Sequence, residues 1–212
     1  MRKIYLTATA ALLLSAGGAA LIAQSSPAPM AQPGQHDATR ITGGSYAVDP
    51  GHTQVLFAYD HMGFTRNMGV IAAPGSGTLT IDPKAPGKAQ VTVSFPVANI
   101  RTGIAALDEH LMKAEMFDTA QFPTATFTST SVKVDPDDME AEITGNLTIK
   151  GVTKEVTLDA EFIGAGTNPM SKKETVGFSA DGIIRRSDFG LGYAVPVVGD
   201  TVELKIVAAF EK

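Results

Sequence analysis

Histidine and carboxylate side chains are the residues whose types could support metal or acid–base chemistry. Asp108 and His110 lie in the stretch LDEHLMKAEMFD, and His61 lies earlier in the chain. Such groups can ligate a transition metal. However, the chain has no His-x-His pair and no HExxH motif, and His52 and His61, nine positions apart, would face opposite sides of a regular strand. We therefore expect no metal and no cofactor, and keep a metal or enzyme site at His61, His110 and Asp108 as an alternative.

Motifs for covalent or phosphate chemistry are also missing from the sequence. The chain has no cysteine and no Gly-x-Ser-x-Gly elbow. Gly164 and Gly166 are spaced like a phosphate-binding turn, but no predicted helix follows them. The sequence therefore predicts a protein that is not an enzyme.

The histidine and acidic residues near position 110 lie on the only good candidate for a helix after the N-terminal stretch. Leu107, Leu111 and Met112 give this short segment an apolar edge, and Pro123 disfavours helix at the residue before it. The threonine-rich run 124–131 that follows favours an extended strand. We expect one short helix that covers an end or an edge of a sheet.

Residues 45–212 otherwise alternate between apolar and polar with a period of two. The pattern predicts an all-β domain of about eight or nine antiparallel strands, each apolar on one face, in a sandwich or a closed barrel. One hairpin can be registered: a four-residue loop at 150–153 would pair Leu147 with Val156 and Ile143 with Ala160.

The N-terminal region differs in composition from this domain. Arg2 and Lys3 precede an apolar run of alanine and leucine, which predicts a cleavable signal peptide over residues 1–23 and export to the periplasm. Residues 24–44 are rich in Ser, Pro, Gln and Gly, and we expect a disordered linker there.

The net charge of −5 becomes more negative by two charges once Arg2 and Lys3 are removed. An acidic chain lacks the electrostatic footprint for nucleic acid, and no lysine-rich helix is present for anionic lipid surfaces. We expect no nucleic-acid partner and at most transient membrane contact.

Six segments together resemble the YceI-like family of exported polyisoprenoid-binding proteins. They are YAVDPGHTQV (46–55), FAYDHMGFTRNMG (57–69), LDEHLMKAEMFDTAQFPTATFTS (107–129), GNLTIKGVTKEVTL (145–158), RSDFGL (186–191) and VGDTVELKIVAAF (198–210). The chain departs from the family pattern after Gly69, where Ile71 and two alanines replace an expected aromatic.

The resemblance implies an extended, antiparallel, lipocalin-like β-barrel with a helix near one end. It also implies an elongated apolar cavity for an isoprenoid, such as an isoprenoid quinone, or a similar long-chain amphiphile, and it makes a homodimer plausible. Composition alone favours a filled core, because most apolar faces simply pack. A filled barrel with a partner-binding role therefore remains a second alternative.

If the cavity exists, two sets of residues should form it. The first set comprises apolar side chains of the predicted strands and helix: Val55, Phe57, Tyr59, Leu79, Val93, Phe95, Leu107, Leu111, Phe117, Phe127, Leu147, Leu158, Phe162, Phe178 and Phe189. The second set could contact a polar head group, because each member lies at or near the end of a predicted element: His61, Arg66, Arg101, His110 and Arg186.

Overall fold

The two-residue alternation of the sequence folds into antiparallel strands. The computed structural model describes residues 31–135 and 137–212, which include the unit Gln32–Lys212. The predicted signal peptide (1–23) and residues 24–30 of the predicted linker lie outside the described residues. Within the described part, the strands are β1 (Gly44–Val48), β2 (Gln54–His61), β3 (Thr65–Ala72), β4 (Ser76–Ile81), β5 (Gln90–Pro96), β6 (Ile100–Arg101), β7 (Thr124–Asp135), β8 (Glu140–Ile149), β9 (Val152–Thr167), β10 (Glu174–Arg185) and β11 (Val198–Glu211).

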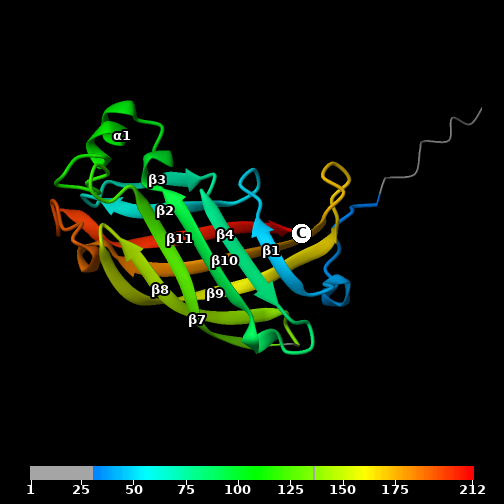
Figure 1. Ribbon diagram of the computed structural model, residues 1–212. Helices are drawn as coiled ribbons and strands as arrows, with labels where there is room; N and C mark the ends of the chain where they lie inside the picture. The colour runs from blue at the N-terminus through cyan, green and yellow to red at the C-terminus, as the bar shows by residue number, and fades with distance from the viewer. Residues whose placement is uncertain (1–30, 136) are drawn as a thin grey trace, which may run out of the picture. The chain divides into compact units, whose positions relative to one another are not determined.

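The strands close into a barrel of eight long strands (Figure 1). β1 and β2 are the two halves of one long strand, because both pair with β11. β4 and β3 are the two halves of the next, because β4 pairs with β1 and β3 pairs with β2. β5 and β6 are the two halves of the third long strand, because β5 pairs with β4 and β6 pairs with β3. The first three long strands are therefore each broken in two. The other five run unbroken from β7 to β11. The predicted antiparallel barrel of about eight strands is confirmed, and the sandwich is excluded.

The three breaks lie at residues 49–53, 73–75 and 97–99. Isolated backbone hydrogen bonds, such as that from the Gly75 N–H to the Ser94 carbonyl at 2.8 Å, and side-chain hydrogen bonds take the place of the regular ladder there. The Thr53 hydroxyl both donates to the Ala209 carbonyl at 3.2 Å and accepts from the Ala209 N–H at 3.0 Å. The Asn99 amide donates to the carbonyls of Ala72 and Ala73 at 3.1 and 3.0 Å. These bonds keep the wall of the barrel joined across the breaks.

The predicted β8–β9 hairpin is present, but its predicted register is wrong. Ile149 pairs with Val152 and Leu147 with Lys154, so the loop has two residues and not four. Lys150 and Gly151 both have positive φ, of 51° and 74°, which is the geometry of the tight type I′ turn that matches strand twist. The error is a slip of two positions, so each side chain stays on its predicted face.

The predicted short helix is α1 (Ala105–Leu111), which lies at one end of the barrel. The Asp108 carboxylate in its first turn accepts hydrogen bonds of 2.7 Å from the N–H and the hydroxyl of Thr102. These bonds hold the loop that enters the helix and keep the pKa of Asp108 below its ordinary value. Leu111 is buried against Val97 and Ile100. We call this end of the barrel the helix end.

The opposite end is closed by residues that the sequence placed in a disordered linker. That expectation is wrong for residues 31–44. Gln35 exchanges two backbone hydrogen bonds, of 3.0 and 2.9 Å, with Ala165 of β9. The 3-10 helix η1 (Ala38–Arg40) follows, and Ile41 is only 7% exposed. We call residues 33–43 the strap and this end of the barrel the strap end; the strap is the blue stretch at the right in Figure 1.

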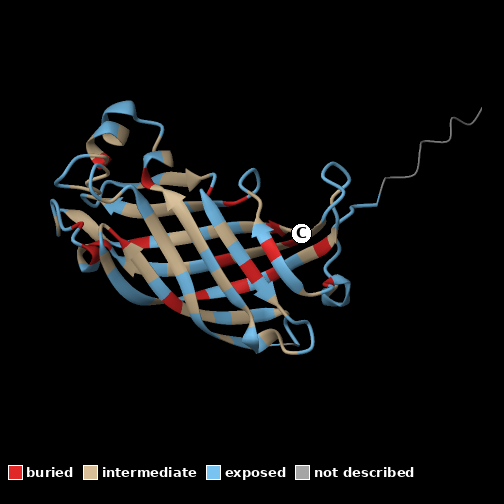
Figure 2. Ribbon diagram, in the orientation of Figure 1, coloured by how far each residue is buried: buried red, intermediate tan, exposed pale blue. Residues whose placement is uncertain are grey.

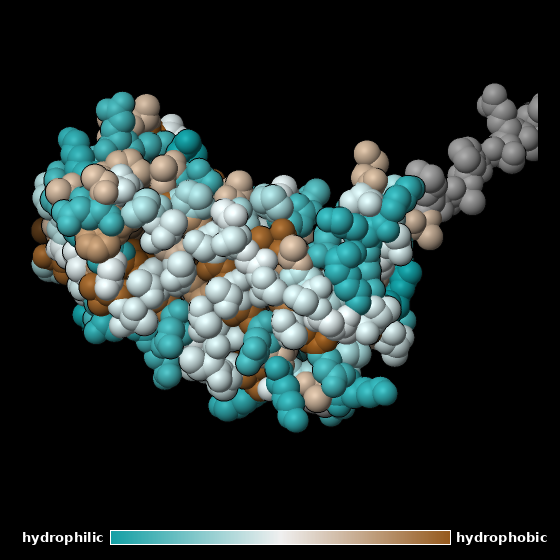
Figure 3. Space-filling model, in the orientation of Figure 1, coloured by the Kyte–Doolittle hydropathy of each residue, from teal (hydrophilic) through white to brown (hydrophobic). Residues whose placement is uncertain are grey.

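Buried side chains gather most densely at the strap end. Ile41, Tyr46, Val176 and Phe210 belong to one cluster there, and Tyr46 and Val176 are fully buried. Figure 2 shows exposed positions alternating along the strands with intermediate or buried ones, as one-sided strands require. The face of the barrel in Figure 3 is covered mainly by polar and neutral residues, with the most apolar ones recessed between them. No helix in residues 31–135 and 137–212 has the length and apolar character needed to cross a membrane.

Candidate functional site

The inward faces of the strands do not fill the barrel. They enclose a cavity of about 780 Å³, within the range typical of ligand pockets. The alternative of a filled barrel is therefore not what the structure shows. The lining comes from strands on every side, from α1 and from the strap, and nearly all of it is apolar.

The structure places all but one of the fifteen predicted apolar site residues on the cavity wall. Those on the wall are Val55, Phe57, Tyr59, Leu79, Val93, Phe95, Leu107, Leu111, Phe117, Phe127, Leu147, Leu158, Phe162 and Phe178. Ile71, where the family pattern expects an aromatic, also lines the cavity.

Phe189 is the exception, and its expected place on the wall is wrong. It is 1% exposed and packs with Ile149 and Leu191 behind the wall. The cause is local: the chain leaves β10 in the 3-10 helix η4 (Arg186–Phe189), which ends at Gly190 with φ of 74°. The strand periodicity therefore stops before residue 189.

Two glycines let aromatic rings lie close against the wall. A Cβ on Gly69 would lie 2.3 Å from the Phe57 ring, and one on Gly145 would lie 2.5 Å from the Phe127 ring. Phe57 and Gly69 are direct partners across β2 and β3. An aromatic ring over a strand glycine covers backbone that would otherwise be exposed, so these pairs give the cavity a smooth aromatic surface.

Polar side chains reach the cavity at the helix end. His61, Asn67, His110 and Tyr193 line it there. The His110 and Tyr193 rings meet edge to face, 5.4 Å between centroids, and the nearest carboxylate oxygen to His110, from Glu115, lies 3.6 Å from Nδ1. These groups offer hydrogen bonds at the rim of an otherwise apolar space.

Arg186 also lines the cavity near this end, and it is 9% exposed. Its guanidinium donates to the carbonyls of Gly199 and Val198 at 2.8 Å each, to that of Tyr193 at 2.8 Å, and to that of Leu191. Burial lowers the pKa of Arg186, and Asp200 and Tyr59 counter that effect. Four of its five donors hold the loop between η4 and β11, so its first role is structural.

Arg66 and Arg101 are not brought to the cavity, so their expected places as head-group contacts are wrong. Arg66 lies on the outer face and pairs with Glu203. Arg101 donates to the nearby carbonyls of Ala98 and Ile100 at 2.7 and 2.6 Å. Both lie at strand ends as expected, but proximity to a strand end does not determine the face on which a side chain emerges.

The structure does not assemble the alternative metal site. His61 and His110 line the cavity, whereas Asp108 is committed to Thr102 and is not part of the lining. Across residues 31–135 and 137–212 there is no group of three or more His, Cys, Asp or Glu side chains placed to hold a metal ion. The geometry therefore gives this alternative no support.

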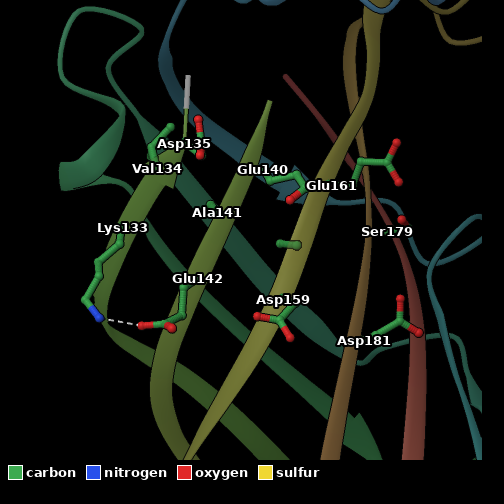
Figure 4. Close-up of a pocket in the computed structure, with 11 residues that line it drawn as sticks. Lys133, Val134, Asp135, Glu140, Ala141, Glu142, Asp159, Glu161, Ser179 and Asp181 are labelled. Carbon is green, nitrogen blue, oxygen red and sulfur yellow. Dashed lines mark hydrogen bonds and ion pairs between the residues drawn. The ribbon is translucent and has the colours of Figure 1, made fainter. Parts of the chain in front are cut away.

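A second hollow, of about 420 Å³, lies against β7–β10 and is lined by acidic side chains (Figure 4). One row across the strands reads Lys133, Glu142, Asp159, Asp181 and Lys205 in direct register. Lys133 pairs with Glu142 at 2.6 Å. Asp159 therefore has a carboxylate as its neighbour on both sides, a repulsive arrangement on an exposed face.

Sequence reasoning missed the wall residues that come from the strap and from the connection between β4 and β5. Ala38 and Ile41 of the strap line the cavity, together with Pro83 and Pro86 from the β4–β5 connection. The available signal was the Gly164 and Gly166 pair, whose missing side chains leave room for the strap: a Cβ on Gly166 would lie 2.1 Å from the Pro33 carbonyl oxygen.

A closed eight-stranded barrel around a largely apolar cavity is the architecture of lipocalin-like binding proteins. The YceI-like domain model matches residues 46–210. The chain belongs to the YceI-like family. It is 41% identical over 155 residues to "Protein YceI" of Escherichia coli O17:K52:H18 and, equally, to that of Salmonella arizonae, covering 73% of this chain and 79% of each relative.

Solved structures agree in fold. A Campylobacter jejuni YCEI protein is similar with a TM-score of 0.62 and 28% identity, over 72% of this chain and 89% of that one. BcnA of Burkholderia cenocepacia gives 0.67 and 23%, over 76% and 98%. A domain from Saccharophagus degradans described as polyisoprenoid binding gives 0.59 and 17%, over 78% and 97%.

Proposed function

We propose that this protein binds an isoprenoid or a similar long-chain amphiphile inside the barrel, for transport, storage or scavenging, and without catalysis. The observation that carries the proposal is the apolar cavity of about 780 Å³. Family membership supports lipid binding in a broad sense, and the Saccharophagus degradans neighbour is described as binding a polyisoprenoid.

The energetics of such a cavity suit a hydrocarbon tail. Each methylene group taken from water contributes about 0.8 kcal/mol, so a long tail binds tightly without specific polar contacts. The fourteen predicted residues that line the wall are the proposed ligand contacts. Smooth apolar walls discriminate weakly between tails of similar width, so selection must come from length and from the head group.

The distribution of polar groups favours one orientation of the ligand. His61, Asn67, His110 and the remaining donor of Arg186 lie toward the helix end, where they would bond a quinone carbonyl or another polar head. At the strap end, Glu140 contributes a carboxylate, which disfavours an anionic head there. We therefore propose that the head group lies at the helix end and the tail terminus at the strap end.

The setting proposed for this activity is the periplasm, reached by means of the predicted signal peptide. A homodimer is proposed from family resemblance. Membrane contact would be transient, because the cargo must pass between a bilayer and the cavity, and nucleic acid is not a proposed partner of an acidic chain.

Native mass spectrometry of the mature protein, before and after solvent extraction, tests the proposal. We expect the unextracted protein to carry a long-chain lipid, and the extracted protein to take one up again from isoprenoid quinones or fatty acids. Extracted protein incubated with short-chain alcohols is the control for unspecific adducts. A clean unliganded mass under every condition would overturn the proposal.

A further inference from the structure

We propose that the strap, residues 33–43, is an end wall that sets the longest tail the cavity accepts. This inference rests on the proposed function, because it concerns which lengths of tail the same cavity can hold.

The strap contributes directly to the inner surface. Ala38 and Ile41 line the cavity, and Ile41 packs with Leu79, Phe162 and Phe210 at the strap end. Both strap residues are apolar, so they suit contact with the hydrocarbon terminus of a ligand better than contact with its head group. A tail that enters from the helix end therefore stops at this wall.

Two attachments hold the strap at this end of the barrel. Gln35 pairs with Ala165 of β9 through two backbone hydrogen bonds. The Phe162 N–H of β9 donates to the Met139 carbonyl just before β8, and β8 does not pair with β9 beyond this point. Gln35 therefore pairs with an edge of β9 that β8 leaves free. Strand edges that lack a partner readily accept another segment, which explains why a polar stretch is ordered here.

On the neighbouring strand β10, the Glu174 carboxylate accepts hydrogen bonds from the strap residue Thr42, at 2.9 Å from its backbone nitrogen and 2.6 Å from its hydroxyl. Lys212 donates to the Thr42 hydroxyl at 2.5 Å. Between the two attachments, Asp37 caps the 3-10 turn through the N–H of Thr39. Both attachments therefore lie on the β9–β10 hairpin, where Thr167 pairs directly with Glu174, and the strap leads from there into β1.

The strap can leave without opening the barrel. The ring of eight long strands closes through β1, β2 and β11, and none of those pairings includes a strap residue. Loss of the strap removes two attachments and the burial of Ile41, but no hydrogen bonds of the ladder. The strap is therefore a wall fitted onto a closed barrel, which makes its effect on tail length separable from folding.

Gly166 offers a substitution that displaces the strap from a distance. A Cβ there would lie 2.1 Å from the Pro33 oxygen and 2.9 Å from its carbonyl carbon, both backbone atoms, so the strap must move away in Gly166→Ala. Gly177→Ala is the matched control: it is a strand glycine on neighbouring β10 whose added Cβ meets only the Gly164 oxygen, at 3.8 Å. Ile41→Ala shortens the wall residue itself and leaves both attachments in place.

The experiment measures binding of isoprenoid quinones with increasing numbers of isoprene units to the full mature chain, by displacement of a fluorescent fatty acid. In the natural chain and in Gly177→Ala we expect affinity to rise with length and then stop rising at one length. In Gly166→Ala and in Ile41→Ala the limit should move to longer tails, with about tenfold or more gained for each additional isoprene unit taken from water.

Hydrogen exchange at the Gln35 amide shows independently whether the strap has moved in Gly166→Ala. If the natural chain binds no quinone of any length, the proposed function fails. If it binds them and the length limit is the same in Gly166→Ala and Ile41→Ala as in Gly177→Ala, the end wall is overturned while the proposed function stands. If Gly166→Ala does not fold, the length limit measured for Ile41→Ala, compared with that of Gly177→Ala, decides whether the end wall stands.

Discussion

The hydroxyl of Tyr46 donates a hydrogen bond of 2.6 Å to the carboxylate of Glu174, joining β1 to β10 at the point where the strap is attached. Tyr46 is fully buried as a residue, and its hydroxyl also accepts the Gly43 N–H at 3.2 Å. The pair is therefore a shared anchor for the barrel and for the strap.

Tyr46→Phe should lower the free energy of unfolding by about 1–2 kcal/mol, because it removes the hydroxyl and leaves the Glu174 carboxylate and the Gly43 N–H with one partner fewer. Urea denaturation of the mature chain measures the change. Tyr193→Phe is the control. Tyr193 is 55% exposed, so removal of its hydroxyl should lower the free energy of unfolding by less than about 0.5 kcal/mol. Equal losses would contradict the anchor.

The strap attachment should weaken in acid. Burial raises the pKa of Glu174, but hydrogen bonds from Thr42 and Tyr46 and the charge of Lys212 outweigh it, so the net shift is downward. A lowered pKa in the folded state means that Glu174 stabilises the fold above the unfolded value of about 4.3, and that this contribution is lost as the pH falls through the folded value.

Hydrogen exchange of the strap amides, followed from pH 6 downward with rates corrected for intrinsic chemistry, measures this loss. Glu174→Gln should show faster exchange at pH 6 and less additional loss of protection below about pH 4.3. The carboxyl groups of Asp49, Asp200 and Glu211 also have lowered pKa values and remain in the variant, so the difference isolates Glu174. A pH dependence identical in both proteins would refute the assignment.

Arg186→Lys should destabilise the protein by about 2–3 kcal/mol despite the retained charge. Lysine has three donors on one atom and cannot reach the four carbonyls that the planar guanidinium holds. Arg185→Lys is the neighbouring control: its side chain is 69% exposed and pairs with Asp200, so the change should cost less than about 1 kcal/mol. Thermal and urea unfolding of both variants gives the comparison.

Phe57→Glu should abolish or strongly reduce lipid uptake, because it places an unpaired carboxylate on the cavity wall, beside Gly69. Glu155→Gln, on the exposed outer face opposite Asn146, should leave uptake unchanged. Retention of a fluorescent fatty acid after gel filtration measures uptake. Similar effects of the two changes would mean that the ligand lies outside the barrel.

Asp159→Lys should stabilise the protein, an unusual result for a charge reversal. The lysine would face Glu142 on one side and Asp181 on the other, and replace two repulsive cross-strand pairs with attractive ones. We expect a gain of about 0.5–1 kcal/mol at low salt, which shrinks as salt screens the pairs. Lys133→Asp, which reverses an existing attraction at 2.6 Å, should have the opposite sign.

The faces of the strands could be predicted from the sequence because side-chain direction in a strand has a period of two. The β8–β9 register was wrong by two positions, yet Leu147 and Leu158 still reached the cavity wall. A slip of one position would have reversed every face. The fourteen apolar residues that line the cavity could therefore be assigned to the inner face without knowledge of the turn type.

The residues that could not be placed are those whose position depends on distant contacts. The strap is polar in composition, and its order comes from Ala165 and Glu174, more than a hundred positions away in the chain. Phe189 follows the end of a strand, where periodicity carries no information. Arg66 pairs with Glu203, which only the folded register brings near, whereas Arg101 bonds to carbonyls close by in the chain, so its failure to reach the cavity has a local cause.

The breaks in the first three long strands divide the wall of the barrel into two parts with different mechanical properties. β7–β11 form a continuous ladder, whereas at 49–53, 73–75 and 97–99 the wall is joined by the side chains of Thr53 and Asn99 and by isolated backbone hydrogen bonds. Amide exchange should be faster along this seam than in β8–β10, because fewer hydrogen bonds must open together. A bulkier ligand would then be accommodated by widening of the barrel along the three breaks, while the continuous strands β7–β11 stay rigid.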